Sequence, residues 1–395
     1  MHHADEYKLP IVSLSVYVHI PYCVKRCGYC DFNTYTPGEL KNGSESVAAV
    51  AEGYVDALLA EIRLAHRRLG RREISTIFFG GGTPTLLPAE HLGRVISALE
   101  ESFGLTSECE ITTEANPDSV DADSLVKLRR AGVNRISFGV QSTKAHVLQV
   151  LDRTHDASRV GAVVREAKSA GFGSVSMDLI YGTPGESLDD FMESVDFALS
   201  LPIDHLSAYA LIVEQGTKFG AAVRRGELLM PNDDETAEKY VKLDEKMALA
   251  GFDWYELSNW SKPGHECRHN RAYWLSADWW GLGAGAHSHI AGVRWWNFKH
   301  PQKYIEKAAS ESSPSAGNEV LSEDEKSVES LMLQIRMREG ITINSLTPEQ
   351  RSMLEQFNSR NLFESESWSA GRLVLSLEGR LLADQIVREL LSSGD

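Results

Sequence analysis

Short β-branched runs alternate with longer segments of helical period over the first two thirds of the chain. The runs predict six strands and a weaker seventh, over residues 12–20, 74–79, 109–115, 135–140, 174–180, 205–212 and 252–257. Between them, the apolar spacing predicts helices over 47–69, 89–103, 122–131, 157–170, 188–199 and 234–250. Alternation of this kind implies parallel strand pairing, so the sequence predicts an α/β fold, either a doubly wound sheet or a barrel of the TIM type.

The chain has 395 residues, a length that predicts two domains, or one large domain with an appendage. Its 40 Lys and Arg residues against 56 Asp and Glu residues give a formal net charge of −16. This charge argues against a nucleic-acid partner, because proteins that bind nucleic acid present a basic face. No apolar run is long enough to span a membrane. Residues 1–10 lack the apolar core of a signal peptide, so we expect a cytoplasmic protein.

Polar and glycine residues follow four of the predicted strands. They are Gly-Gly-Gly-Thr at 80–83, Glu-Ala-Asn-Pro at 114–117, Gly-Val-Gln at 139–141, and Asp178. In parallel α/β folds the functional site lies at the carboxyl ends of the strands. Any one of these segments is equally consistent with an ordinary turn, but their grouping favours one shared site at the mouth of a barrel.

Three of the five cysteines form a C-x3-C-x2-C cluster, Cys23, Cys27 and Cys30, directly after the first predicted strand. Soft sulfur ligands select zinc, copper(I) or an iron–sulfur cluster. Structural zinc needs a fourth ligand, which would have to come from His19 or from a distant residue. A [4Fe–4S] cluster held by three cysteines leaves one iron open, and the spacing favours this alternative over zinc.

Seven of the eight tryptophans fall between Trp254 and Trp296, where the strand–helix alternation stops. We therefore divide the chain into a barrel of residues 1–258, an aromatic-rich connecting segment of 259–309 and a C-terminal domain of 310–395. The stretch 310–325 is rich in Ser, Glu, Pro and Gly and is expected to be an exposed linker. Beyond it, the pattern predicts helices over 328–337, 348–357 and 381–391 and a short strand over 373–377.

The cysteine cluster follows Tyr-Val-His-Ile-Pro-Tyr at 17–22 and continues as Gly-Tyr-Cys-Asp-Phe-Asn at 28–33. With these flanks it resembles the signature of the radical S-adenosylmethionine (SAM) superfamily. Gly-Gly-Gly-Thr-Pro-Thr at 80–85 narrows the resemblance to the coproporphyrinogen III dehydrogenase (HemN) family. The resemblance runs from about residue 14 to 300 and more loosely to the C-terminus. It implies a partial TIM-type (β/α)6 radical SAM barrel with a small C-terminal α+β domain that is winged-helix-like.

The resemblance implies two cofactors, a [4Fe–4S] cluster on the three cysteines and S-adenosylmethionine on the open iron. The residues that match S-adenosylmethionine contacts of the family are Tyr17, Gly81, Gly82, Thr83, Glu114, Gln141, Arg153 and Asp178. Within this set, Gly81 lies in the loop that approaches the methionine moiety, and Glu114 resembles the carboxylate that binds the ribose hydroxyls. The residues Gly82, Thr83, Gln141, Arg153 and Asp178 match contacts to a second S-adenosylmethionine. Without the resemblance, Arg153 and Asp178 are better explained as a structural ion pair.

One position departs from the coproporphyrinogen oxidases, which carry a fourth cysteine two residues after the third. Here that position is Phe32, which places the chain with the HemW branch, understood as haem chaperones. The segment His-Asn-Arg-Ala-Tyr-Trp at 269–274 matches the H-N-x-x-Y-W motif associated with haem in that branch. The resemblance therefore implies a haem site of His269, Asn270, Tyr273 and Trp274, with flat apolar area from Trp279 and Trp280.

Two other interpretations of this segment stay open. Rival axial ligands for haem iron are Cys267, His265, His287 and His289. Alternatively, the segment is an aromatic core in which His269 is only hydrogen-bonded.

The resemblance implies a haem chaperone that binds haem and delivers it to acceptor haemoproteins. The alternative is an oxygen-independent coproporphyrinogen III oxidase, and a third hypothesis is anaerobic haem breakdown. No catalytic residue is assigned. The resemblance further implies a flavodoxin- or ferredoxin-type electron donor and allows a homodimer. The C-terminal domain is expected to cover the barrel mouth or to meet an acceptor protein.

Overall fold

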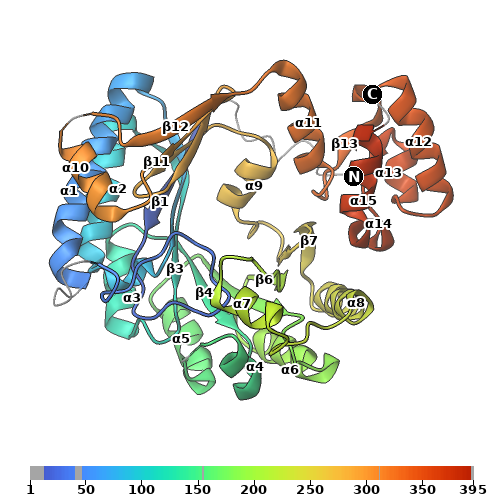
Figure 1. The fold of residues 1–395 in the computed structure, drawn as a ribbon, viewed down its shortest axis with the longest axis horizontal. Coiled ribbons are helices and arrows are strands. Elements are labelled where there is room, and N and C mark those ends of the chain that lie inside the picture. The colour runs from blue at the N-terminus through green and yellow to red at the C-terminus, as the bar shows by residue number, and fades with distance from the viewer. Residues whose placement is uncertain (1–12, 41–46, 154, 311, 393–395) are drawn as a thin grey trace.

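The computed structural model describes residues 13–40, 47–153, 155–310 and 312–392. Its main feature is a curved 12-stranded sheet with the order β12-β11-β10-β9-β1-β2-β3-β4-β5-β6-β8-β7 (Figure 1). The strands are β1 Leu14–Ile20, β2 Ile74–Gly81, β3 Leu105–Ala115, β4 Arg135–Gln141, β5 Ser174–Tyr181, β6 His205–Ala210, β7 Asp253–Glu256, β8 Asn259–Ser261, β9 Trp279–Leu282, β10 His287–Ile290, β11 Val293–Asn297 and β12 Ser315–Val320.

Strands β1 to β6 are parallel and lie side by side in chain order, which confirms the predicted α/β class. The helices that accompany them are α1 Val47–Leu69, α2 Ala89–Phe103, α3 Ala122–Arg130, α4 Ala145–Val150, α5 Ala157–Ser169, α6 Leu188–Leu199, α7 Lys218–Arg224 and α8 Asp233–Leu249. Neighbouring pairs such as α1–α2, α2–α3 and α3–α5 contact one another and cover the outer face of the sheet (Figure 1). The result is the expected partial barrel, with an open concave side.

The helix ends follow from local chemistry. Asp121 and Ser187 begin α3 and α6 with capping boxes, in which the side chain accepts a hydrogen bond from the backbone three residues on. Predicted and observed bounds of α1, α2 and α6 coincide. The strand predicted over 12–20 is observed from Leu14, and residue 12 lies outside the described part. The strand predicted over 205–212 ends earlier, at Ala210.

The aromatic-rich segment completes the same sheet. Strand β8 pairs antiparallel with β6, and the chain then forms α9 (Arg268–Trp274) on the concave side (Figure 1). Strand β9 returns to the other end of the sheet and pairs parallel with β1. Strands β10, β11 and β12 extend that end by antiparallel pairing, and α10 (Pro301–Ala309) packs against α1.

The expectation that 310–325 is a linker is wrong in part. Residues Ser315–Val320 form the edge strand β12, and α11 (Glu323–Gln334) begins directly after it. The sequence of β12, Ser-Ala-Gly-Asn-Glu-Val, has no apolar alternation, and most of its side chains are exposed. Backbone pairing with β11 holds it in the sheet, which is why side-chain pattern did not reveal it.

The C-terminal part has its own hydrophobic core, formed by buried residues between Leu331 and Leu390. Its elements are α11, β13 Ile341–Thr342, α12 Pro348–Ser359, α13 Ser365–Ser369, β14 Arg372–Leu373, α14 Leu377–Leu381 and α15 Ala383–Ser392. The helix predicted over 381–391 is therefore divided, and the predicted strand 373–377 is two residues long, paired with β13. None of the helices in the described ranges is sufficiently long and apolar to cross a membrane.

Candidate cofactor site

A cavity of about 1060 Å³ opens at the carboxyl ends of the parallel strands. Every predicted site residue lines it except the tryptophans Trp274, Trp279 and Trp280. The predicted residues that line it are Tyr17, Cys23, Cys27, Cys30, Gly81, Gly82, Thr83, Glu114, Gln141, Arg153, Asp178, His269, Asn270 and Tyr273. The structure thus brings the cysteine cluster, the glycine loop and the His269 motif to one space. This volume lies at the upper end of the range for small-molecule sites.

The cysteine loop leaves β1 and closes on itself. At its neck, the backbone N–H of Cys23 donates to the carbonyl of Tyr35 at 3.1 Å, and the N–H of Tyr35 donates to the carbonyl of Pro21 at 2.6 Å. Between these points the N–H of Cys30 donates to the carbonyl of Cys27 at 3.2 Å, which forms a tight turn. The three thiols are therefore held on one short, closed loop at the cavity.

The surroundings of the three sulfurs fit a group bound by thiolates. Arg153 donates from Nη1 to Cys27 Sγ at 3.4 Å, and the Thr83 hydroxyl donates to Cys23 Sγ at 3.9 Å. Burial raises the pKa of Cys23 to about 11 and also raises the pKa of Cys30, so positive charge must accompany thiolate formation. Within the described ranges, no set of three or more His, Cys, Asp or Glu side chains is arranged to hold a single metal ion. A [4Fe–4S] cluster poses a different requirement, because each thiolate binds its own iron.

The glycine loop is packed against the end of β1 and not only against the cavity. A Cβ on Gly81, whose φ is +105°, would lie 2.3 Å from the His19 ring. A Cβ on Gly82 would lie 2.5 Å from the backbone oxygen of Tyr22. Glycine was predicted here because a ligand approaches the loop closely. The structure adds that a side chain at either position would collide with residues that follow β1 or lie in it.

Two carboxyl groups, Glu114 near the end of β3 and Asp178 within β5, line the cavity. Glu114 accepts a hydrogen bond from the backbone N–H of Gly81 at 3.1 Å. Burial and the neighbouring Asp178 raise the pKa of Glu114 to about 8. Burial also raises the pKa of Asp178, although the Ser137 hydroxyl donates to its two oxygens at 2.9 and 3.0 Å. The raised pKa values favour the neutral carboxyl groups. A cationic ligand would favour their ionised form, and a hydroxyl-bearing ligand could hydrogen-bond to them.

Arg153 connects the cysteine loop to the strand ends. Besides Cys27, it donates to Asn116 Oδ1 at 2.7 Å and to the carbonyl of Gly139 at 2.5 Å. Asn116 in turn donates to the Thr83 hydroxyl at 3.1 Å. The sequence reasoning placed Asn116 in a strand-end motif but gave it no role, and the structure shows it at the centre of this network.

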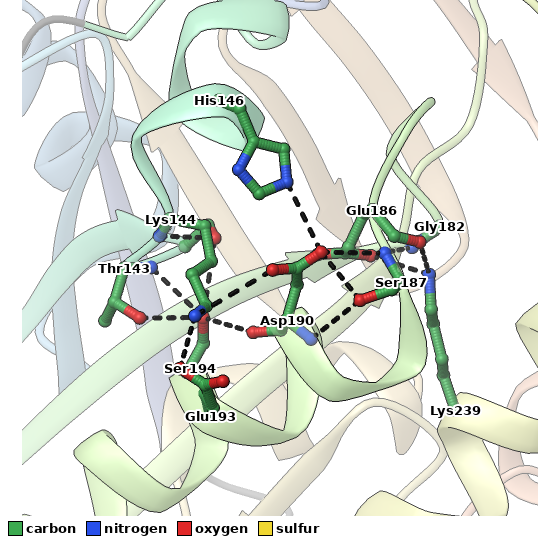
Figure 2. Close-up of polar contacts among 11 residues, drawn as sticks. Thr143, Lys144, His146, Gly182, Glu186, Ser187, Asp190, Glu193, Ser194 and Lys239 are labelled. Atoms are coloured by element: carbon green, nitrogen blue, oxygen red, sulfur yellow. Dashed lines mark hydrogen bonds and ion pairs between the residues drawn. The ribbon is translucent and has the colours of Figure 1, made fainter.

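A second polar network fixes the loops that follow β4 and β5 (Figure 2). Asp190 accepts from the backbone N–H of Ser187 at 3.0 Å and pairs with His146 at 3.3 Å. Ser194 bonds to Thr143, which lies two residues after Gln141. Gln141 itself has a φ of +66°, a conformation that non-glycine residues adopt only where their surroundings hold them.

The loop after β5 is pinned from the other side by a buried ion pair. Lys239 of α8 lies 3.0 Å from Glu186 Oε2 and also donates to the backbone oxygen of Glu186 at 2.7 Å (Figure 2). The same carboxylate accepts from the N–H of Gly182 at 2.8 Å. Both side chains are almost fully buried, so the pair fixes the loop beside the cavity.

His269 lies on α9 and is 2 % exposed. Its Nδ1 is 2.8 Å from the Thr76 hydroxyl and its Nε2 is 3.0 Å from the Tyr273 hydroxyl, so both ring nitrogens have partners. Burial lowers the pKa of His269 to about 3, which keeps the imidazole neutral. A neutral imidazole is the form that binds metals, but an iron atom would have to displace one of these hydroxyls.

The tryptophans of the segment lie outside the cavity wall. Trp280 is buried in the main core, and its ring centroid lies 4.8 Å from that of Trp295. Trp279 packs edge-to-face on Tyr273 at 4.8 Å. Trp274, at the end of α9, does not line the cavity with His269, Asn270 and Tyr273. The structure therefore differs from the expectation of a flat tryptophan surface facing a macrocycle.

Cavity residues that the sequence reasoning missed come from distant parts of the chain. They include Arg135, Tyr209, Asn259 and, from the C-terminal part, Arg380, Leu381 and Asp384. Arg380 pairs with both oxygens of Asp244 on α8, at 2.7 and 2.6 Å, and lies over the ring of Trp254 at 4.3 Å. No local motif marks these residues. Arg135, Tyr209 and Asn259 reach the cavity through the pairing of β4, β6 and β8 in the sheet, and Arg380, Leu381 and Asp384 reach it through the contact of the C-terminal part with α8.

Comparison with known proteins defines the class first. The model of the radical SAM superfamily matches residues 17–198. The fold is similar to that of coproporphyrinogen III oxidase (HemN) from Escherichia coli, with a TM-score of 0.79 over 96 % of this chain and 90 % of that chain. At 23 % identity this likeness shows the fold alone. Fold, cysteine loop and glycine loop together define a radical SAM protein.

The family within this class follows from closer relatives. The chain is 45 % identical to the haem chaperone HemW of Mycobacterium tuberculosis, over 97 % of this chain and 96 % of that protein. It is 33 % identical to HemW of Bacillus subtilis, over 94 % and 97 % of the two chains. The chain belongs to the HemW haem-chaperone family of the radical SAM superfamily.

Proposed function

We propose that this chain binds haem and passes it to acceptor haemoproteins, and that a radical SAM core serves this task. The observation that carries the proposal is that the helix with the H-N-x-x-Y-W motif, α9, opens onto the same cavity as the cysteine loop. Full-length similarity to proteins named as haem chaperones supports it.

In this proposal Cys23, Cys27 and Cys30 hold a [4Fe–4S] cluster, and S-adenosylmethionine lies between the glycine loop and Glu114. When bound, the cluster supplies electrons at low potential. The residues of the chain position it: Arg153 donates to Cys27 Sγ and at the same time fixes Asn116. Tyr17, whose hydroxyl lies 3.0 Å from His19 Nδ1, closes the side of the cavity nearest to β1.

Equilibrium dialysis with S-adenosylmethionine would test whether one or two molecules bind. The proposal assigns Tyr17, Gly81 and Glu114 to the first molecule. A second would contact Gly82, Thr83, Gln141, Arg153 and Asp178. Of these, Thr83 and Arg153 already bond to the cysteine sulfurs, so the proposal favours a single molecule.

The electron donor is proposed to be a flavodoxin- or ferredoxin-type protein that docks beside the cysteine loop. The chain is acidic overall, but Lys25 on this loop and Lys218 on α7 share the single carboxylate of Asp152. Lys218 is 79 % exposed, so a positive charge faces solvent beside the cluster site. Docking of an acidic donor there weakens with salt, because surface charges are screened.

The C-terminal domain, residues 310–395, is proposed to cover the cavity. Ion pairs join it to the rest of the chain. Arg380–Asp244 and Arg338–Asp253, at 2.9 Å, connect it to the barrel, and Arg271–Glu339, at 2.6 Å, connects it to the aromatic-rich segment. Arg271 belongs to α9, the helix with the H-N-x-x-Y-W motif, so the C-terminal domain contacts the motif helix directly. The proposal places the protein in the cytoplasm. It also allows a homodimer, which light scattering would detect.

Titration of haem into the cluster-reconstituted chain tests the function. We expect a saturable change in the Soret band, and absence of saturable binding would refute the proposal. Ligation by His269 is tested in the same assay with two variants. If His269 is the axial ligand, His269→Ala weakens binding, and Tyr273→Phe binds at least as tightly as wild type because it frees Nε2. Unchanged binding by His269→Ala places the haem away from this histidine. Coproporphyrinogen III, supplied anaerobically with reductant and S-adenosylmethionine, should remain unchanged.

A further inference from the structure

A group of exposed apolar side chains lines the cavity. Among the described residues, four of the eleven large hydrophobic side chains that are exposed to solvent belong to its lining. They are Ile212 at 72 %, Phe32 at 63 %, Tyr209 at 46 % and Leu381 at 40 % exposure. We call these four residues the apolar rim. Exposed apolar groups gathered at one place mark interaction sites, whereas single ones scattered over a surface do not.

The rim stands on a firmly packed base. Phe32 lies on the cysteine loop, and Tyr209 and Ile212 lie at and just after the end of β6. The cysteine loop is also joined to α7, where the N–H of Phe219 donates to the carbonyl of Gly28 at 2.8 Å. Below the rim, Tyr29 of the cysteine loop and Leu211 pack against the same small core of Val147, Leu151 and Ile180. The exposed side chains are therefore presented by an ordered surface.

Tyr209 shows how the rim is built. Its hydroxyl accepts a hydrogen bond from Asn259 Nδ2 at 3.4 Å, deeper in the cavity, while nearly half of the residue is exposed. An aromatic ring anchored by its polar end and open on its face is suited to contact a flat apolar ligand. Leu381, on α14, is the rim residue that the C-terminal part contributes to the cavity.

The deeper part of the cavity is less suited to a large apolar ring. It carries the carboxyl groups of Glu114 and Asp178 and the buried guanidinium of Arg135, and His269 there is closed in by Thr76 and Tyr273. Burying an apolar macrocycle against charged groups costs their solvation. At the rim, by contrast, the macrocycle covers side chains that otherwise face water.

Cations adjoin the rim on one side. Lys25 and Arg26 line the cavity two to three residues from Cys23, and Lys25 shares Asp152 with Lys218. The carboxylates of Asp31 and Glu214 also line the cavity, so these cations offer local contacts and not a net positive charge. A flat apolar ring that carries carboxylates at one edge fits this combination of surfaces.

We propose that the apolar rim binds the macrocycle of a tetrapyrrole, with the propionate edge toward Lys25 and Lys218. The inference rests on the proposed haem binding and adds where the macrocycle lies. It makes the rim, and not the His269 pocket, the surface from which haem is accessible to an acceptor. Because the rim contacts the ring and not the iron, iron-free protoporphyrin IX should also bind.

The test compares variants in two titrations, haem followed in the Soret region and protoporphyrin IX followed by fluorescence. The double variant Phe32→Ser/Ile212→Ser should weaken both ligands by about tenfold or more, since each substitution removes apolar area that the ring would cover. The matched control is Leu249→Ser, whose side chain is 89 % exposed but lies away from the cavity, and its affinities should equal wild type. All three positions are exposed, so urea unfolding should not change.

The outcomes separate the two proposals. If wild type binds haem but the rim variant binds both ligands as tightly as Leu249→Ser, the rim inference is refuted and the proposed function stands. If wild type binds haem but not protoporphyrin IX, the macrocycle is held through its iron and the rim inference is also refuted. If wild type binds neither, the proposed function itself fails.

Discussion

Replacing Gly81 by alanine should cost the protein a large part of its stability. The residue has a φ of +105°, and holding a side-chain-bearing residue in such a conformation costs about 1–3 kcal/mol. The new Cβ would also lie 2.3 Å from His19 Cε1 and 2.4 Å from Nδ1, an overpacking that costs about 1–3 kcal/mol more. Together the two effects predict a loss of about 2–6 kcal/mol in the free energy of unfolding.

His19 cannot easily move aside. Its Nε2 lies 2.9 Å from the carbonyl of Asn33 and its Nδ1 lies 3.0 Å from the Tyr17 hydroxyl, while the residue is 6 % exposed. Rotation of the ring would break both bonds, at about 0.5–1.5 kcal/mol each. The strain therefore stays in the glycine loop, where the N–H of Gly81 also donates to Glu114.

Urea unfolding of the purified chain measures this effect. The matched control is Gly53→Ala, because Gly53 lies within α1 and its added Cβ would meet nothing within 4 Å. In a helix interior that change should stabilise the protein by about 0.5–1 kcal/mol. A Gly81→Ala variant within about 0.5 kcal/mol of wild type would show that the His19 contact does not constrain the loop, and the reasoning would be refuted.

Three further predictions concern charge, docking and the cluster. Ionising Glu114 in the ligand-free fold is unfavourable, so its pKa of about 8 against an ordinary 4.5 means that stability is lost as pH rises between these values. The slope should approach about 1.4 kcal/mol per pH unit, and urea midpoints of Glu114→Gln should lack it. Arg380→Met should destabilise the protein by about 3–5 kcal/mol, because Asp244 loses its bidentate partner, and an unchanged denaturation midpoint would contradict this. Cys27→Ser should abolish the visible absorbance of a reconstituted iron–sulfur cluster, whereas Cys109→Ser, in the core of β3, should keep it.

Much of the barrel could be predicted because each strand from β1 to β6 contains apolar or β-branched residues and is followed by a segment of helical period. The strands from β9 to β12 could not, because they are four to six residues long and rich in Trp, His or polar residues. Their place in the sheet depends on pairing with β1, which lies more than 250 residues earlier in the chain. Tertiary pairing of this kind leaves no local pattern.

The candidate site shows the same division. Motifs that follow single strands, such as Glu114 and Gly81, were found because the topology sends all strand ends to one edge. The tryptophans were misjudged, since an aromatic run has the same sequence signature whether it forms a core or a ligand surface, and Trp280 forms core. Arg380 and Tyr209 were missed because only the folded arrangement brings them to the cavity.

The central claim is that haem bound by this chain is passed on to other proteins. It is tested most directly by mixing the haem-loaded, cluster-reconstituted chain with the apo form of a b-type cytochrome and following the Soret spectrum. We predict that the band of the loaded chain is replaced by the band of the holo-cytochrome. A loaded chain that keeps its haem, while the same apo-cytochrome takes up free haem, would contradict the account.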